Sequence, residues 1–331
     1  MNRVGSCGSL WSPTMTDDAM PEQLANVLGV ASVHEVVRLS GGASRETFRF
    51  TARGHLADSV GDVRILQRQR AGSERSVADE VAVLGAAKDA GVPVPEVLAW
   101  SADPSLLGAP FMVLTHVAGE TIARKIQRDA RYATAREVLP AQLGDALARL
   151  HGVPTAAVAD LVEVDQLSQY REVLDTLAQP HPAFELAFRW LGDNRPTTNR
   201  RVILHGDFRL GNVIVDERGL AAVLDWELAH LGDPMEDLGW LCVKAWRFGG
   251  KAPVAGLGSY DELFAAYEVA SGVAVDPQVV RWWETLGTLK WGIMCIMQTT
   301  AHLTGTSRSH ELAAIGRRVC ENEHDLFLLL P

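Results

Sequence analysis

Apolar and polar positions change their spacing about a third of the way along the chain. Between residues 33 and 66, β-rich segments alternate with a Gly-Gly turn and with a loop that contains Gly and Asp, a pattern typical of strands joined by turns. A helix is predicted over residues 74–90, because Gly91 and the two prolines that follow it end such a pattern. Further strands are predicted over residues 96–100 and 111–116. We therefore expect a small N-terminal lobe of strands and one helix at residues 25–116.

Helical spacing dominates the rest of the chain. Leu143, Leu147 and Leu150 recur on one face, and residues 281–303 present a broad apolar face that is typical of a core helix. We expect residues 117–120 to be a hinge and residues 121–331 to form a larger, mainly helical lobe. The first 24 residues, which contain Gly, Ser, Pro and Asp, are expected to be a disordered leader. The predicted fold class is α+β with two lobes.

Composition narrows the class of protein. Of the 331 residues, 47% are hydrophobic and 22% are charged, which is ordinary for a globular chain. The formal net charge of −10 argues against a nucleic-acid partner and is compatible with a cationic substrate. Four scattered cysteines indicate neither a zinc site nor a disulfide framework. No apolar run suits export or a membrane span, so we expect a cytoplasmic protein; the oligomeric state is not indicated.

The stretch of residues 205–227 contains the most informative polar side chains. Two short apolar runs, residues 213–215 and 221–224, flank a tight Asp-Glu-Arg-Gly turn and predict a β-hairpin. Asn212 comes just before the first strand and Asp225 just after the second, so antiparallel pairing would bring an amide oxygen and a carboxylate together. Oxygen ligands of this kind suit Mg²⁺, which takes only one or two protein ligands beside substrate phosphates. We therefore predict a magnesium site at Asn212 and Asp225.

Residues 205–212 read His-Gly-Asp-Phe-Arg-Leu-Gly-Asn, and residues 225–227 read Asp-Trp-Glu. With this spacing the chain resembles the aminoglycoside phosphotransferase and choline kinase family, which are small-molecule kinases with the protein-kinase-like fold. Within that family it is similar to a broad bacterial branch and to the kinase domains fused to some acyl-CoA dehydrogenases. The resemblance covers about residues 25–300 and is sharpest over residues 204–240. It implies a two-lobed protein-kinase-like fold with ATP and Mg²⁺ as cofactors.

The resemblance also implies roles for single residues. Asp207 would orient and deprotonate the hydroxyl of a small-molecule substrate, while Asn212 and Asp225 hold magnesium against the nucleotide phosphates. Arg209 either stabilises the transferring phosphoryl group or pairs with a carboxylate. His205 is expected to brace the loop rather than to act in acid–base chemistry. The competing interpretation is that Asp207 and Asn212 merely shape a turn, since both residue types bond their own backbone readily.

A nucleotide is expected to bind to the N-terminal lobe. Gly41, Gly42 and Ser44 lie between two predicted strands, where glycine lets backbone amides approach phosphates and the serine adds a hydroxyl. The same residues are equally compatible with an ordinary hairpin turn. By resemblance to the kinase hinge, the carbonyl of Thr115 and the amide of Val117 are expected to bind adenine.

The third predicted strand should carry a cation for the nucleotide phosphates, yet it has no lysine. Gln67 occupies the first place after the apolar pair of that strand and Arg68 the second. We predict that Arg68 binds phosphate and pairs with Glu80, which falls on the core-facing stripe of the next helix and needs a partner there. Two alternatives stay open. A slip of one residue would exchange Gln67 and Arg68, and both charged side chains could instead reach solvent.

Three functions fit this sequence. The preferred one is an ATP- and Mg²⁺-dependent kinase that moves the γ-phosphate to the hydroxyl of a small molecule. Its acceptor stays open between an aminoglycoside and a hydroxyacyl compound or other metabolic alcohol. A catalytically weak nucleotide-binding protein is the first alternative, because the third strand lacks lysine. A protein kinase is disfavoured, because the His-Arg-Asp, Asp-Phe-Gly and Ala-Pro-Glu patterns are absent.

The acceptor pocket is expected in the helical lobe. Trp246, Trp282, Trp283 and Trp291 are candidates for its walls, although tryptophans more often pack in a core. A polycationic drug would require clustered carboxylates in the same place. The sequence offers several carboxylates after residue 226, but their convergence in space is not readable from their order.

Overall fold

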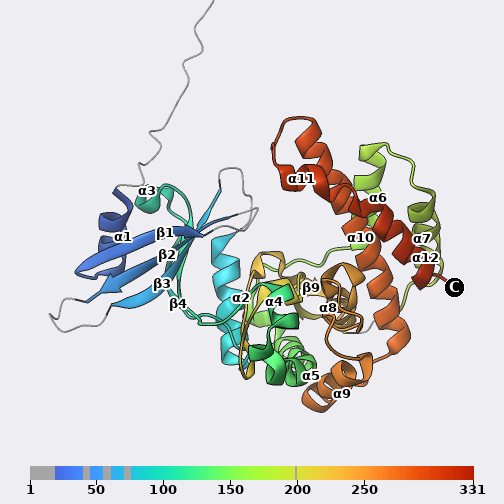
Figure 1. Cartoon of the computed structure of the whole chain (residues 1–331), viewed down its shortest axis with the longest axis horizontal. Coiled ribbons are helices and arrows are strands. Elements are labelled where there is room, and N and C mark those ends of the chain that lie inside the picture. The colour runs from blue at the N-terminus through green and yellow to red at the C-terminus, as the bar shows by residue number, and fades with distance from the viewer. Residues whose placement is uncertain (1–18, 40–44, 55–60, 71–75, 198–199) are drawn as a thin grey trace, which may run out of the picture. The chain divides into compact units, whose positions relative to one another are not determined.

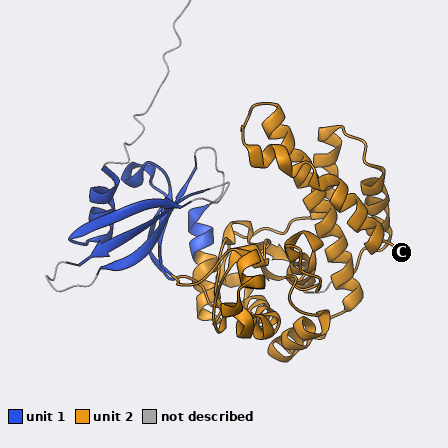
Figure 2. Cartoon of the chain, in the orientation of Figure 1, with its two compact units in different colours: residues 1–81, 96–116 blue, residues 82–95, 117–331 orange. Residues whose placement is uncertain are grey.

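The computed structural model describes residues 19–39, 45–54, 61–70, 76–197 and 200–331. The chain divides into two compact units (Figure 2): unit 1 comprises residues 1–81 and 96–116, and unit 2 comprises residues 82–95 and 117–331. Unit 1 contains a five-stranded sheet, whereas unit 2 is mainly helical with two short two-stranded sheets (Figure 1). This organisation confirms the α+β class expected from the sequence.

The strands of the described residues are β1 (Ser32–Leu39), β2 (Arg45–Arg53), β3 (Asp62–Gln69), β4 (Val97–Ser101), β5 (Phe111–Thr115), β6 (Val202–Leu204), β7 (Val213–Asp216), β8 (Gly219–Val223) and β9 (His230–Gly232). The α-helices are α1 (Met20–Leu28), α2 (Val77–Asp89), α3 (Pro104–Leu107), α4 (Ala123–Arg128), α5 (Ala133–His151), α6 (Gln166–Leu177), α7 (Pro182–Asp193), α8 (Met235–Cys242), α9 (Tyr260–Ser271), α10 (Pro277–Leu303), α11 (His310–Ile315) and α12 (Arg318–Leu329). The predicted strands and helices lie within a few residues of these bounds.

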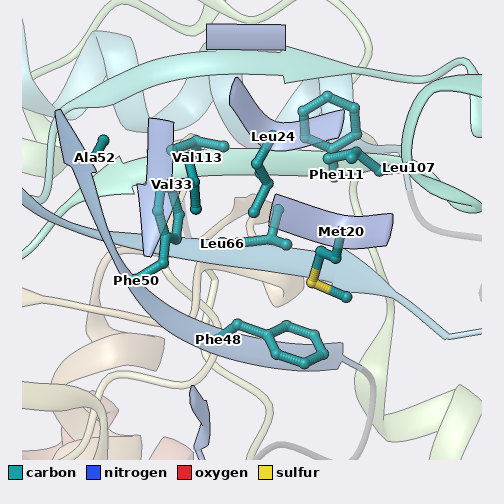
Figure 3. Packing of buried hydrophobic residues seen from close by; sticks show 10 residues of the cluster. All are labelled: Met20, Leu24, Val33, Phe48, Phe50, Ala52, Leu66, Leu107, Phe111 and Val113. Atoms are coloured by element: carbon teal, nitrogen blue, oxygen red, sulfur yellow. The ribbon is translucent and has the colours of Figure 1, made fainter. Parts of the chain in front are cut away.

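The sheet of unit 1 is antiparallel throughout, in the order β1-β2-β3-β5-β4. On one face, Met20 and Leu24 of α1 pack with Phe48, Phe50 and Leu66 of the sheet (Figure 3). Because side chains alternate between the faces of a strand, residues 46, 48 and 50 of β2 share this α1 face with residues 64, 66 and 68 of β3. Residues 45 and 47 of β2 and residues 65 and 67 of β3 occupy the opposite face.

Helix α1 corrects the expectation that residues 1–24 form a disordered leader. Residues 1–18 lie outside the described part of the chain, but α1 begins at Met20. Met20 and Leu24 are at most 2% exposed, because the apolar side of this helix completes the core of the sheet. Residues 20–24 therefore belong to the folded unit.

Unit 2 is assembled around α10, which contacts α6, α7, α8 and α12. Its apolar face, including Trp282, Leu286 and Leu289, is buried in one core cluster, as the spacing of those residues predicts. The neighbouring helix α8 approaches it closely at Gly239, where a Cβ would stand 2.6 Å from the Cβ of Trp283. In the described part of the chain, no helix combines the length and the apolar character that a membrane span requires.

Residues 82–95 group with unit 2, in contrast to the expected lobe boundary at residue 116 alone. Helix α2 begins in unit 1 and ends in unit 2. The segment that follows it is held by unit 2, because the N–H of Val223 donates to the carbonyl of Pro93 at 2.8 Å. A Cβ at Gly91 would also lie 3.1 Å from the guanidinium of Arg149. Such long-range contacts have no signal in the local sequence.

Candidate active site

A tight turn positions the loop of residues 205–212. β6 ends at Leu204, and Gly206 follows with a φ of +79°, in the left-handed region. A Cβ at Gly206 would stand 2.3 Å from the carbonyl oxygen of Leu228, so only glycine fits this close approach. The turn leads into Asp207 and then into the short 3-10 helix η4 (Leu210–Asn212).

The carboxylate of Asp207 receives hydrogen bonds from three side chains. Arg209 Nε donates to Oδ1 at 3.0 Å, and Asn212 Nδ2 donates to Oδ2 at 2.6 Å. Trp240 Nε1 donates to Oδ1 at 2.8 Å. These bonds fix the orientation of the carboxylate. Its side chain keeps 14% exposure, so a small polar group can still reach it.

His205 and Asp237 hold this loop in place. The backbone N–H groups of His205 and Gly206 donate to the carboxylate of Asp237 at 2.8 and 3.0 Å. The His205 ring accepts the N–H of Asp207 at 3.2 Å through Nδ1 and donates from Nε2 to the carbonyl of Leu224 at 2.9 Å. These contacts match the bracing role predicted for His205.

The pKa of the Asp237 carboxyl group is lowered in spite of its complete burial. Burial alone would raise the pKa of its carboxyl group. The hydrogen bond from His151, the electrostatic effects of His151 and His205, and the hydrogen bond from the backbone N–H of His205 outweigh burial, so the pKa is lowered. A buried carboxylate of helix α8 thus anchors the backbone of the loop from behind.

The predicted hairpin is confirmed. β7 pairs antiparallel with β8, with Val213 opposite Val223. The N–H of Leu224 donates to the carbonyl of Asn212 at 2.8 Å, so Asn212 and Asp225 flank the same end of the hairpin. Because the amide nitrogen of Asn212 is directed at Asp207, its amide oxygen is directed away from that carboxylate. The three predicted residues therefore come together in one region of unit 2.

Asp225 provides the electrostatic argument for a cation. Burial raises the pKa of its carboxyl group, and the carboxylates of Glu227 and Asp207 raise it further. Its φ of +65° lies in the left-handed region, which is uncommon outside glycine and is often found at functional sites. Carboxylates that gather in this way repel one another, and a divalent cation would relieve that repulsion. Asn212 and Asp225 therefore fit Mg²⁺, which needs few protein ligands.

No competing metal site is present among the described residues. Groups of three or more His, Cys, Asp or Glu side chains with an arrangement suited to a metal ion do not occur there. The cysteines at positions 242, 295 and 320 are free thiols.

The sequence left two roles open for Arg209, one at the transferring phosphoryl group and one beside a carboxylate. Arg209 pairs with a carboxylate, and this carboxylate is Asp207 itself. Its guanidinium also lies 4.8 Å from the ring centre of Trp246. Trp246 packs against Trp240 at 5.1 Å and against Trp291 at 4.7 Å between ring centres. Two of the four tryptophans proposed as pocket walls, Trp246 and Trp291, thus continue a row of indoles. The row begins with Trp240, which donates to Asp207.

The predicted pair of Arg68 and Glu80 is wrong. Arg68 donates from Nη2 to Glu46 at 2.6 Å and from Nη1 to the carbonyl of Leu107 at 3.1 Å. It therefore lies on the α1 face of the sheet. Glu80 is bonded instead by Arg45 of β2, on the opposite face. The sequence order of β3 gave no indication that the partner of Glu80 comes from the preceding strand.

The other residues predicted to bind the nucleotide are Gly41, Gly42, Ser44, Thr115 and Val117. Gly41, Gly42 and Ser44 lie outside the described residues. Thr115 ends β5 and exchanges hydrogen bonds with Glu96, whose N–H donates to the threonine hydroxyl at 2.9 Å. Thr115 belongs to unit 1 and Val117 to unit 2. Their contacts with adenine stay a prediction.

A comparison with protein families identifies the family of this chain. The phosphotransferase enzyme family, abbreviated APH, matches residues 35–283, which is most of the chain and includes every residue of the Asp207 loop and the hairpin. The chain belongs to this family. Family membership therefore assigns it to the phosphotransferases.

Individual relatives extend the comparison. Acyl-CoA dehydrogenase family member 10 of Mus musculus is 27% identical over 80% of this chain, but the match spans only 26% of the mouse protein. A choline/ethanolamine kinase family protein from Mesorhizobium loti has a TM-score of 0.65 at 21% identity, covering 96% of this chain and 95% of its own. The GDP complex of aminoglycoside 2'-phosphotransferase-IIIa has a TM-score of 0.65 at 14% identity, covering 92% and 97%. At such identities the structures establish the kinase-like fold of this phosphotransferase.

Proposed function

We propose that the chain transfers the γ-phosphoryl group of ATP to a hydroxyl group of a small molecule, in the presence of Mg²⁺. The observation that carries this proposal is the joint arrangement of Asp207, Asn212 and Asp225. Asn212 bonds the carboxylate of Asp207, and the hairpin brings Asp225 alongside. Structures of several proteins with the same fold contain nucleotides, including GDP, ADP and AMP-PNP. These complexes support a nucleotide as the phosphoryl donor here.

In the proposed reaction, Asp207 accepts a hydrogen bond from the acceptor hydroxyl and takes its proton as the alcohol oxygen attacks the γ-phosphorus. One P–O bond forms to the acceptor, and the P–O bond to the departing ADP breaks. The bonds from Arg209, Asn212 and Trp240 keep the Asp207 carboxylate in one orientation for this step. Mg²⁺ held by Asn212 and Asp225 would neutralise phosphate charge.

A specific observation favours an acceptor that carries a negative charge over a polycationic drug. Each of the three neighbouring indoles has a cation over its ring: Arg209 lies over Trp246, Lys290 lies 4.6 Å from the ring centre of Trp240, and Arg318 lies 5.7 Å from that of Trp291. Arg209 and Arg318 are paired with the carboxylates of Asp207 and Glu321, whereas Lys290 donates to the neutral amide oxygen of Gln166. The charge of Lys290 beside Trp240 would disfavour a polycationic aminoglycoside and favour an anionic group. A hydroxyacyl compound or another anionic alcohol is therefore the second candidate acceptor.

Three of the carboxylates that a polycation would need are engaged elsewhere. Each of these makes a contact inside the fold: Glu236 with Gln166, Glu262 with the N-cap Ser259, and Glu284 with Arg247 and Tyr260. They serve packing and helix capping rather than a common surface near Asp207. This distribution adds support for the anionic acceptor.

The test is a screen of hydroxyl compounds for release of ADP, with aminoglycosides, choline-like amines and hydroxyacyl thioesters as three groups. We expect turnover with at least one anionic alcohol. Asp207→Asn should remove at least about 99% of that turnover, because a missing general base typically costs 10²–10⁴-fold, and ATP binding should be retained. Asp145→Asn, in an exposed ion pair with Arg149, is the matched control and should keep normal turnover.

Three results would contradict the proposal. Turnover that is unchanged in Asp207→Asn would rule out this residue as the base. A wild-type chain that binds ATP and Mg²⁺ but phosphorylates no alcohol would instead favour the catalytically weak nucleotide-binding protein. Phosphate found on protein rather than on a small alcohol in a labelled lysate would favour a protein kinase.

A further inference from the structure

The cation beside Glu80 comes from an unexpected strand. The sheet places Arg45 of β2 and Gln67 of β3 on one face, opposite the face that carries Phe48 and Leu66. Arg45 Nη1 donates to Oε1 of Gln67 at 3.2 Å, and Nη2 of the same guanidinium donates to Oε2 of Glu80. A β2 arginine, a β3 amide and an α2 carboxylate thus form one group inside unit 1.

This group is deeply buried. The side chain of Arg45 is 7% exposed and that of Glu80 is 5% exposed. A buried charge of either sign is costly unless it is paired and hydrogen-bonded, and an ion pair is not by itself a gain in stability over apolar packing. Retention of two charges and an amide at this place is therefore more readily explained by a ligand-binding role than by stability.

The described cations of β3 do not reach the same face. Arg64 and Arg68 alternate with Gln67 and therefore lie on the α1 face together with Leu66. Arg68 is further engaged by Glu46 and by the carbonyl of Leu107. In protein kinases the cation that binds the nucleotide phosphates is a lysine of the third strand, paired with a glutamate of the following helix. Here the glutamate is present, but the third strand offers Gln67.

We propose that Arg45 supplies from β2 the phosphate-binding cation that the third strand lacks, and that Gln67 and Glu80 are positioning residues for its guanidinium. The inference rests on the proposed function, because it names the residue that binds the nucleotide phosphates in that reaction. A guanidinium suits this task, since its fork of N–H donors can hold a carboxylate and a phosphate oxygen together. Arg68 then acts only within the core of the sheet.

The experiment compares Arg45→Gln with Arg68→Gln, two variants that each remove one ion-paired arginine from neighbouring strands. For each we would measure kcat, the KM for ATP, and the inhibition constant of adenosine, which lacks phosphates. Arg45→Gln should raise the KM for ATP by about 10- to 100-fold, the value of one or two charged hydrogen bonds, and should leave the adenosine constant within about twofold. Arg68→Gln should keep both constants.

A relocation variant separates phosphate binding from folding. Arg45→Gln combined with Gln67→Arg moves the cation to β3 on the same face, so Glu80 keeps a charged partner. We expect this double variant to recover most of the ATP affinity lost in Arg45→Gln. Thermal melting of all variants, including Arg45→Gln combined with Glu80→Gln, shows whether a change in KM merely follows a loss of folded protein.

The outcomes distinguish this inference from the proposed function. A wild-type chain that neither binds nor consumes ATP overturns the proposed function. Normal wild-type turnover with an unchanged KM for ATP in Arg45→Gln overturns the assignment of Arg45 alone. An equal loss of ATP and adenosine affinity in folded Arg45→Gln also overturns it, because the residue would then be structural.

Discussion

The orientation of the Asp207 carboxylate is set by the side chains that donate hydrogen bonds to it. Two of its donors, Arg209 and Asn212, come from the same loop and are fixed by sequence spacing. The third, Trp240, comes from helix α8, 33 residues further along the chain. Its indole also packs at a tilted angle against Trp246, and Lys290 lies over its ring. Trp240 is therefore a positioning residue for the base.

Trp240→Phe should lower kcat by about 10- to 100-fold, because it removes one hydrogen bond to a charged group while the ring is kept. The KM for ATP should change little. Steady-state kinetics at saturating ATP would measure the effect. Trp282→Phe is the control, since it loses an indole bond of 3.0 Å to the carbonyl of Leu191 in a core away from Asp207. An equal fall of kcat in both variants would show a general loss of folding.

His230 and Glu236 make stability depend on pH. Burial of His230 opposes its protonation, but the hydrogen bond and charge of Glu236 outweigh burial, so the pKa of His230 is raised. A raised pKa means that the contribution to stability is complete below the unfolded value of about 6.5 and is lost as the pH rises through the folded value. Glu236→Gln should therefore lower Tm more at pH 6 than at pH 9. A gap in Tm that is equal at both pH values would contradict this.

At the scale of elements, the loop before Asp207 is shaped by contacts to two other segments. Gly206 approaches the carbonyl of Leu228 too closely for any side chain. Asp237 of α8 accepts the N–H groups of His205 and Gly206. The turn is thus held by the chain beyond the hairpin and by a helix terminus, and its geometry depends on both.

Gly206→Ala should destabilise the fold by about 2 kcal/mol or more, because the new Cβ meets both a left-handed backbone and the Leu228 carbonyl. Gly192→Ala is the matched control. Gly192 is an exposed residue of α7, and a Cβ there meets nothing within 4 Å. Alanine should stabilise that helix by up to about 1 kcal/mol. Urea denaturation of both variants measures the two signs, and a stable Gly206→Ala would contradict the proposed crowding.

At the scale of the whole molecule, the net charge does not describe the charges near Asp207. The chain has a formal net charge of −10, which is compatible with a cationic substrate. The residues around the indoles near Asp207 include Arg209, Lys290 and Arg318. The same region also contains the carboxylates of Asp207, Asp225 and Glu227, so the net charge alone does not describe it. Arg45 belongs to unit 1, and Asp207 belongs to unit 2.

Binding of Mg²⁺ and ATP should raise the stability of the whole chain. A nucleotide complex at one hundred times its Kd stabilises the native state by about 2.7 kcal/mol. The increase should appear as a shift in Tm on addition of ATP with Mg²⁺ and should shrink when EDTA removes the metal. Asp225→Asn should fold, because asparagine tolerates the left-handed conformation, but should lose the metal-dependent part of the shift. A full shift in this variant would exclude Asp225 as a ligand.

Local sequence was sufficient for the parts of this protein whose geometry is local. The β7–β8 hairpin follows from two apolar runs and one turn, and it alone brings Asn212 and Asp225 together. The core face of α10 follows from helical periodicity. The predicted pairing of Arg68 was wrong because it depends on a contact that is not local. The neighbours of Arg68 along the strand cannot reveal which face a partner from α2 will meet, so the prediction gave Glu80 the wrong arginine.

The order of residues by itself determined the class of fold, the loop that contains the proposed base, and the pair proposed to bind metal, because each depends on local spacing. Tertiary structure alone decided that Trp240 supports Asp207, that Arg45 meets Glu80 and that cations gather on three indoles. Those contacts join residues that lie far apart along the chain. They form only when helices and sheet faces pack together, so the local sequence does not reveal them.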